Sequence, residues 1–199
     1  QDAQVDLGRV NVRYGVAMGY NPTDHFRAGA LRSVASITPQ SLKEDRQGSV
    51  VLRGQQLWEG GALTGVVSPR LSSHAHSDGF SLDWGATNPR DRALLAWSQQ
   101  LSETVSPQVL VYREHGLPAQ FGLNLTGLYG HATVAYLEWS GGRGPSLLGQ
   151  ALQQATPMAW RNRLASGLTY TAPSKLSLTA EVQYNGAALE RAAWRALRD

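Results

Sequence analysis

The sequence contains no cysteine, only two lysines and no long uninterrupted apolar run. The absence of cysteine excludes disulfide bonds, zinc–thiolate sites and a cysteine nucleophile. No stretch reaches the roughly 18 apolar residues that a transmembrane helix requires, so that kind of membrane span is excluded. A net charge of +3 is too small to argue for nucleic acid as a partner, and no aromatic–basic binding motif is present.

Catalytic and metal-binding signatures are also missing. The sequence has neither a Gly-x-Ser-x-Gly elbow nor a phosphate-binding loop. Asp24 and His25 could form a catalytic pair, but a turn over residues 21–25 explains them better. His74 and His76 have a spacing that could suit a metal in an extended segment, although loop histidines are usually just solvated. We therefore predict no enzyme activity, no metal and no cofactor.

What the sequence does contain is strict period-two alternation, which is clearest in residues 176–185. This stretch covers about ten residues, the length of a strand that crosses a bilayer at a tilt. A soluble sheet with one apolar face would alternate in the same way, so repetition along the chain must decide. The apolar positions are Leu176, Leu178, Ala180, Val182 and Tyr184, and the polar positions are Ser177, Thr179, Glu181, Gln183 and Asn185.

The same pattern recurs and predicts about nine antiparallel strands in one domain over residues 1–199. Residues 80–87 also alternate, but counting them would make the long connections change sides partway along the chain. We therefore expect residues 69–91 to be one long outer loop, with 80–87 as a hairpin arm inside it. The predicted strands are residues 10–20, 49–58, 62–68, 92–101, 108–114, 120–129, 132–140, 160–171 and 176–185.

Two further features favour a transmembrane β-barrel. Long connections after residues 20, 68, 140 and 185 fall on one side and short turns on the other, as outer loops and inner turns do. Aromatic residues lie at or next to strand ends, where membrane barrels carry aromatic girdles. The predicted girdle residues are Tyr20, Trp58, Tyr129, Trp139, Trp160, Tyr170 and Tyr184.

With these repeats, the chain resembles Gram-negative outer-membrane β-barrel proteins of the porin-like kind. The likeness rests on the alternating strands, on turns such as residues 172–175, and on residues 167–171 followed by 176–184. It implies an outer-membrane location, contact with lipid and passive passage of small solutes. The odd strand number and the start at Gln1, without a signal peptide, predict a processed chain or a segment of a larger barrel. The resemblance identifies neither the solute nor the oligomeric state.

Function in such a barrel would lie on the polar face of the strands, which would line the lumen. Arginine rings favour anions in pores, because guanidinium groups bind carboxylate and phosphate by paired hydrogen bonds. Alternatively, Arg161 or Arg163 could pair with Glu181 across one hairpin and simply fill the interior. The predicted lumen-lining residues are Arg13, Arg53, Asn124, Arg161, Arg163 and Glu181.

Two other interpretations stay open at this stage. The chain could be a soluble all-β binding module, in which the apolar faces of residues 10–20 and 176–184 form a core. It could also be an outer-membrane scaffold or secretion barrel, which would show the same pattern. Replacing Val12 or Val182 by arginine would distinguish a membrane barrel from a soluble module, because it blocks membrane insertion in the barrel and disrupts a core in the module.

Overall fold

The chain folds into a single sheet of nine antiparallel strands in sequence order, each hydrogen-bonded to the next. This computed structural model describes residues 2–27, 29–30, 46–74, 82–148 and 157–188. The prediction of an all-β, up-and-down fold with nine strands is confirmed. The strands are β1 (Asp2–Val10), β2 (Ser49–Trp58), β3 (Gly61–Ser68), β4 (Arg92–Gln99), β5 (Val105–Glu114), β6 (Gln120–Tyr129), β7 (Thr133–Gly144), β8 (Ala159–Thr171) and β9 (Ser177–Asn185).

The alternation of long and short connections is also confirmed. Residues 59–60, 100–104, 130–132 and 172–176 connect strands on one side, which we call the short-turn side. The connections 11–48, 69–91 and 145–158, together with the shorter 115–119, lie on the opposite, long-connection side. Residues 69–91 are indeed one connection, but the predicted hairpin arm is wrong, because Trp84–Thr87 forms the short helix α2. Residues 75–81 lie outside the described residues.

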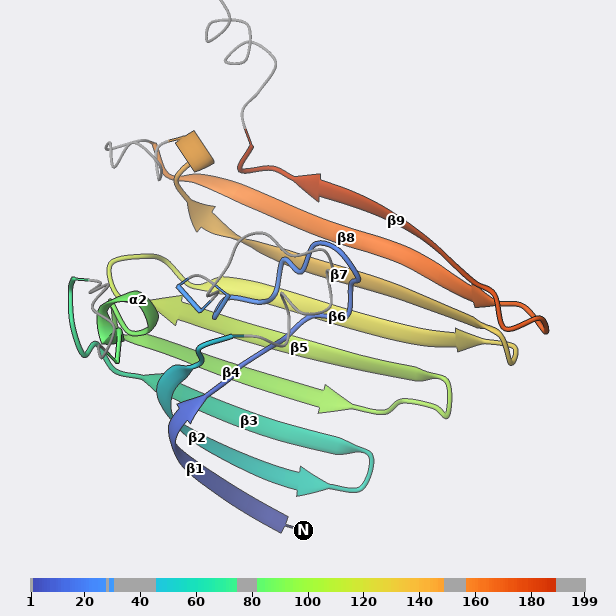
Figure 1. Ribbon diagram of the computed structural model, residues 1–199, viewed down its shortest axis with the longest axis horizontal. Helices are drawn as coiled ribbons and strands as arrows, with labels where there is room; N and C mark the ends of the chain where they lie inside the picture. The colour runs from blue at the N-terminus through green and yellow to red at the C-terminus, as the bar shows by residue number, and fades with distance from the viewer. Residues whose placement is uncertain (1, 28, 31–45, 75–81, 149–156, 189–199) are drawn as a thin grey trace, which may run out of the picture.

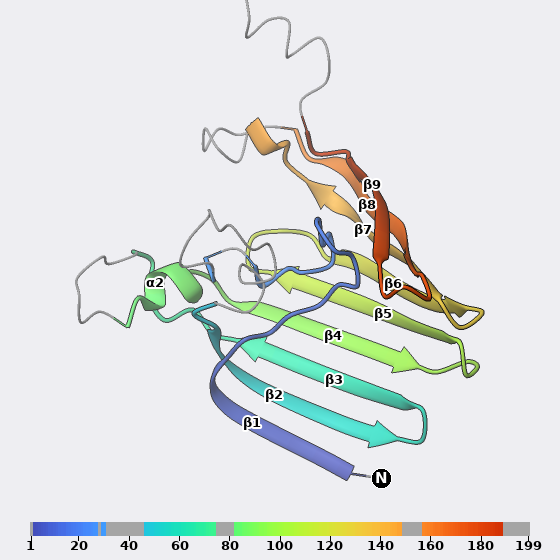
Figure 2. The ribbon, with the colours of Figure 1, turned by 45° about the vertical axis from the view of Figure 1, so that its right-hand side comes forward.

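The first strand differs from the prediction. β1 is Asp2–Val10, whereas residues 11–20, expected to span, contain no strand. Instead, the chain turns back after Val10 and runs along the concave side of the sheet, as the blue trace shows in Figure 2. We call residues 11–27 and 29–30 the inner segment. The apolar positions of this segment therefore pack inside the fold rather than forming an outward strand face.

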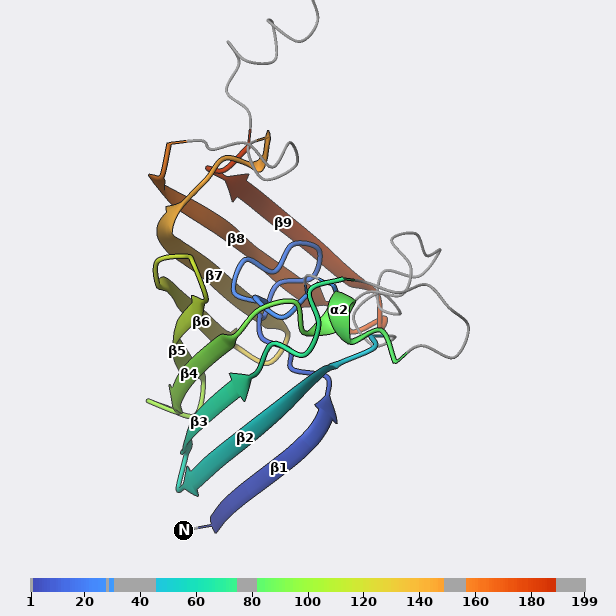
Figure 3. The same ribbon diagram turned by 90° about the vertical axis from the view of Figure 1, so that its left-hand side faces the viewer.

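The sheet is strongly curved and forms an open trough. Figures 1 and 3 show β1 and β9 at its two edges, with the inner segment in the concavity between them. Among the described strands, β1 pairs only with β2 and β9 only with β8, so the sheet is not closed. No helix in the described ranges is long and apolar enough to span a membrane.

The two faces of the sheet have opposite surroundings. Residues paired directly across an antiparallel ladder share a face, so the register assigns every strand residue to the convex or the concave side. Large apolar side chains on the convex side are exposed to an unusual degree, with Leu7 at 81% and Val182 at 71%. Further exposed members of this convex band are Val5, Leu52, Leu63, Val67, Leu95, Trp97, Val109, Val111, Phe121, Leu168, Tyr170, Leu178 and Tyr184.

The hydrophobic core lies on the concave side, between the sheet and the inner segment. Val12 and Phe26 of the inner segment pack against buried side chains of β2 to β5, and Tyr14 joins from the rim. A smaller cluster joins Ala17 of the inner segment to Tyr136 and Ala165. Val12 is therefore a core residue and not part of an outward apolar face, contrary to the prediction. The strand side chains of the larger cluster are Val51, Val66, Leu94, Ala96, Leu110 and Tyr112.

Candidate functional site in the trough

The concave wall of the trough has two chemically different halves. The half from β2 to β5 holds the larger buried apolar cluster beneath the inner segment, together with polar concave side chains such as Arg53, Thr64 and Arg92. In the half from β6 to β9, the concave positions are mostly polar or small: Asn124 and Glu138 face each other across β6 and β7, and Ser140 faces Arg163 across β7 and β8. The second half carries Arg161 and Arg163, two of the predicted lumen residues, on its concave side.

Glu138 on β7 holds the middle of the inner segment from below. Its side chain is fully buried. Its Oε2 accepts hydrogen bonds from the backbone N–H groups of Val16 (2.9 Å) and Ala17 (3.1 Å) and from Asn21 Nδ2 (3.1 Å). Its Oε1 accepts from both the N–H (2.8 Å) and the hydroxyl (2.9 Å) of Thr23. Five donors thus compensate one buried carboxylate, as a buried charge requires.

Glu181 on β9 holds the next turn of the same segment in a more exposed position. Its Oε2 accepts from Met18 N–H at 2.7 Å, and Gly19 and Tyr20 donate at 3.2 to 3.3 Å. The Tyr136 hydroxyl donates to the same carboxylate at 2.6 Å. Successive backbone amides that converge on one carboxylate form an anion-binding concavity. The inner segment is therefore fastened to the polar half of the wall by two carboxylates.

Asn124 was predicted to line the lumen, but it is buried and serves the same attachment. Its Oδ1 accepts from the Thr23 hydroxyl at 2.9 Å, and its Nδ2 donates to Gln108 at 2.9 Å. Only 1% of Asn124 is exposed, so it cannot meet a solute in this conformation. The polar row Gln108, Asn124, Glu138 is occupied by the inner segment.

The far part of the inner segment carries ionisable groups into the trough. Asp24 forms a buried ion pair with Arg46 at 2.6 Å. Burial raises the pKa of Asp24, and the hydrogen bond from Arg46 opposes that change. His25 stacks on Tyr112 with ring centroids 4.4 Å apart. Burial, assisted by the charge of Arg163, lowers the pKa of His25 to about 4, so its ring is neutral at pH 7.

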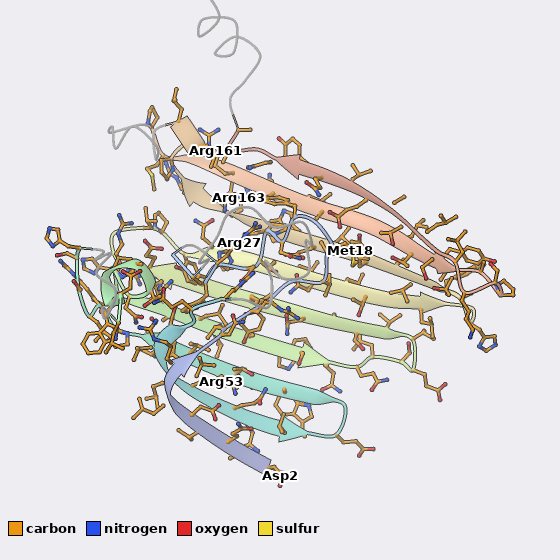
Figure 4. All side chains as sticks on the ribbon, viewed as in Figure 1. Asp2, Met18, Arg27, Arg53, Arg161 and Arg163 are labelled. Atoms are coloured by element: carbon orange, nitrogen blue, oxygen red, sulfur yellow. The ribbon has the colours of Figure 1, made fainter. Side chains whose placement is uncertain are left out.

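The predicted lumen arginines have different surroundings (Figure 4). Arg53 on β2 pairs with Asp6 of β1 at 2.5 Å, so its charge is compensated. Arg13 is exposed but lies in the inner segment rather than on a strand. Arg161 donates to the Gly186 carbonyl at 3.2 Å. Within the described residues neither Arg161 nor Arg163 forms an ion pair with Glu181, whose cross-strand partner is Gly167.

Six of the seven predicted girdle residues lie on strands, and the register puts all six on the convex face. Trp58, Tyr129 and Tyr170 lie toward the short-turn side, whereas Trp139, Trp160 and Tyr184 lie toward the long-connection side. The exception is Tyr20, which lies in the inner segment and packs against the smaller buried cluster. Tyr20 therefore does not belong to a girdle.

Sequence reasoning missed several residues that organise the trough. Glu138 is not among the predicted site residues, although a carboxylate within the otherwise apolar stretch 134–139 could have marked it as buried. Asn88 is a second example: its Nδ2 donates to the carbonyls of Val50 and Pro69, and its Oδ1 accepts from the Val50 N–H. It joins the long connection 69–91 to the start of β2.

No protein-family model, curated protein or solved structure matches the chain. Within the described part of the chain, no three His, Asp or Glu side chains gather in a way that could hold a metal ion.

Proposed function

We propose that this chain forms the wall of an outer-membrane β-barrel that acts as a porin-like channel or transporter for small solutes. The convex face would contact lipid, and the polar half of the concave face would line the aqueous path. Solutes would pass by diffusion, biased by the charges on that wall and by the inner segment folded into the trough.

The observation that carries this proposal is the exposed apolar band on the convex face. It extends from Leu7 on β1 to Val182 on β9, across the whole sheet. Monomeric soluble proteins rarely expose contiguous apolar patches of more than a few hundred Å². A lipid-facing surface accounts for the band, and the aromatic side chains toward both ends of the strands fit the two interfaces of a bilayer.

The strand order adds a constraint on how the sheet would close. In an antiparallel sheet of nine strands, β1 and β9 run in the same direction, from the short-turn side to the long-connection side. Direct pairing of these edges would be parallel. Antiparallel closure therefore requires an odd number of additional strands, which would also satisfy the unpaired edge groups that cannot face lipid.

The inner segment favours the proposal of a channel over that of a scaffold barrel with an empty lumen. It covers the larger buried cluster of β2 to β5 and the row Gln108, Asn124, Glu138, and it leaves Arg161 and Arg163 partly exposed. Such an element would narrow the path and bring passing solutes close to the wall charges.

The test compares arginine at two positions of β9, three residues apart, in the natural full-length protein. Val182 lies on the convex face and Thr179 on the concave face, so Val182→Arg and Thr179→Arg differ mainly in the side to which they point. In a membrane barrel, arginine at the lipid face costs about 2–4 kcal/mol near the midplane. We expect Val182→Arg to reduce the heat-modifiable, detergent-extracted outer-membrane form, and Thr179→Arg to leave it in place.

A soluble binding module remains the alternative, and the same experiment separates it. If the wild-type protein stays in solution without detergent and shows no change in migration on boiling, the membrane proposal fails. Conductance of the purified wild-type protein in planar bilayers then distinguishes a channel from a barrel that serves as a scaffold.

A further inference from the structure

We propose that Arg163, Arg161, Ser140 and Arg27 form a binding site for an oxyanion, a carboxylate or a phosphate, on the polar half of the trough. This inference deepens the proposed function and rests on it for its biological role. The binding chemistry itself depends only on the fold.

The sheet register brings the wall residues of this site together. Arg163 on β8 lies directly opposite Ser140 on β7, and both belong to the concave face. Arg161 is two residues before Arg163 on the same strand, so it shares that face at a spacing of about 6.6 Å. The next concave position beyond Ser140 is Gly122, which adds no side chain. Figure 4 shows Arg161, Arg163 and Arg27 toward the long-connection side of the trough.

Arg27 reaches the same place from the inner segment. Tyr20 connects the two arginines, because the charges of Arg163 and Arg27 both act on its hydroxyl group. Burial raises the pKa of Tyr20, and these two positive charges oppose that rise. Arg163 also acts on His25 of the inner segment. The charges of both guanidinium groups therefore reach Tyr20, which packs between the inner segment and the wall.

Several polar atoms of the site have no partner. The Ser140 side chain is 1% exposed, yet its hydroxyl has no hydrogen-bond partner, and neither does the buried Nε of Arg161. In the part of the chain that the structure describes, the guanidinium groups of Arg163 and Arg27 form neither a hydrogen bond nor an ion pair. Buried polar groups are normally paired, so the buried Ser140 hydroxyl and Arg161 Nε indicate a missing acceptor, and the partly exposed Arg163 and Arg27 leave it accessible from the trough.

The nearby carboxylates are already occupied and do not supply that acceptor. The charge of Glu138 acts on Tyr20, as the charges of Arg163 and Arg27 do, but both oxygens of Glu138 accept hydrogen bonds from the inner segment. Asp24 is paired with Arg46, and Glu181 accepts from Met18. His25 is neutral at pH 7. The site therefore holds three arginine charges without a dedicated counter-charge.

An oxyanion matches this arrangement. Guanidinium groups bind carboxylate and phosphate oxygens through short, charge-assisted hydrogen bonds, and a hydroxyl can donate one more. The partly exposed Arg163 and Arg27 would meet the anion first, with Ser140 and Arg161 beneath them. Because the site faces the trough and the apolar band faces away from it, the ligand is a dissolved anion and not a lipid headgroup.

The test measures binding of inorganic phosphate to the delipidated full-length protein in detergent by isothermal titration calorimetry. We expect Arg163→Gln and Arg27→Gln each to weaken phosphate binding about tenfold or more. Arg70→Gln is the matched control, because Arg70 is an exposed arginine in a long connection away from the wall, and it should stay within about twofold. Circular dichroism of each variant verifies that the sheet is retained.

Each outcome decides one point. Wild-type protein that does not bind phosphate, or an Arg163→Gln variant that binds like wild type, overturns the site. A protein that binds vesicles containing anionic lipid but does not bind free phosphate also overturns it. The proposed function is tested separately by conductance: an active channel with no phosphate binding refutes the site alone, whereas arginine-dependent phosphate binding without conductance refutes the channel alone.

Discussion

The attachment of the inner segment by Glu138 gives the sharpest prediction. Replacing Glu138 by Gln keeps the size of the side chain but removes the charge and one of the two acceptor oxygens. All five donors around this carboxylate come from the inner segment, and the side chain is fully buried. The effect therefore reports how strongly the inner segment is held to the wall.

The magnitude follows from the geometry of the two oxygens. With the glutamine oxygen at the Oε2 position, the bonds from Val16, Ala17 and Asn21 persist without charge assistance, at a loss of about 1 kcal/mol each. The Thr23 hydroxyl can donate to Asn124 alone, at 2.9 Å. The Thr23 N–H has no substitute acceptor, which costs about 1–3 kcal/mol. The total is about 4–6 kcal/mol, which is a factor of roughly a thousand or more in the opening equilibrium of the segment.

Hydrogen exchange with residue resolution measures this opening directly. We expect Glu138→Gln to accelerate exchange at Val16, Ala17 and Thr23 by about a thousandfold, while the amides of the strands stay protected. Glu181→Gln is the matched comparison, because Glu181 holds the exposed amides of Met18 and Gly19, where water can replace it. Its effect should be confined to those amides and stay below about tenfold. An acceleration of less than tenfold in Glu138→Gln would refute the view that this carboxylate anchors the segment.

Two further predictions concern pH and the long connection 69–91. The pKa of His25 is lowered from 6.5 to about 4, so its contribution to stability is complete above pH 6.5 and is lost as the pH falls toward 4; the full difference is about 3 kcal/mol. The raised pKa of Asp24 has the opposite effect on stability, but Asp24 is unchanged in His25→Phe, which can still stack on Tyr112. The urea midpoint of this variant should therefore fall less between pH 7 and pH 4.5 than that of wild type. An equal fall of the two midpoints would contradict this prediction. Asn88→Ala leaves the Val50 N–H without its acceptor and should cost about 2–4 kcal/mol, seen as faster proteolysis within residues 82–91. Asn11→Ala, at an exposed asparagine of the inner segment, is the control and should match wild type.

Much of the fold could be predicted from the sequence because the strands carry period-two alternation of apolar and polar residues. β9 alternates strictly, since its concave face is polar and its convex face is apolar along its whole length. The connections could be predicted as well, because short turns and long loops must alternate sides in an up-and-down sheet. The short helix α2 could not, because four residues carry no recognisable helical period.

The candidate site could be predicted only in part. Their spacing predicts one face for the two arginines of β8, and the register places both on the concave side, but their partners depend on which loop enters the trough. Glu138 and Asn124 receive their hydrogen bonds from residues more than 100 positions away in the sequence. No local pattern encodes such a contact, so an acceptor that anchors the inner segment looked like an ordinary lumen residue.

The misassigned stretch over residues 11–20 shows what period-two alternation measures. Val12 and Tyr14 pack in the larger cluster on β2 to β5, and Val16 packs against the smaller cluster near Tyr136. A strand with one face toward lipid and a segment lying on an apolar wall impose the same alternation, because each needs one apolar side. The wall itself leaves a signal: β4 is apolar on both faces, with Leu94 and Ala96 turned inward and Leu95 and Trp97 outward. Such double-sided strands imply that something apolar covers the concave face. β4 alternates weakly and residues 11–20 alternate strongly for the same reason, which is the apolar contact between the sheet and the inner segment.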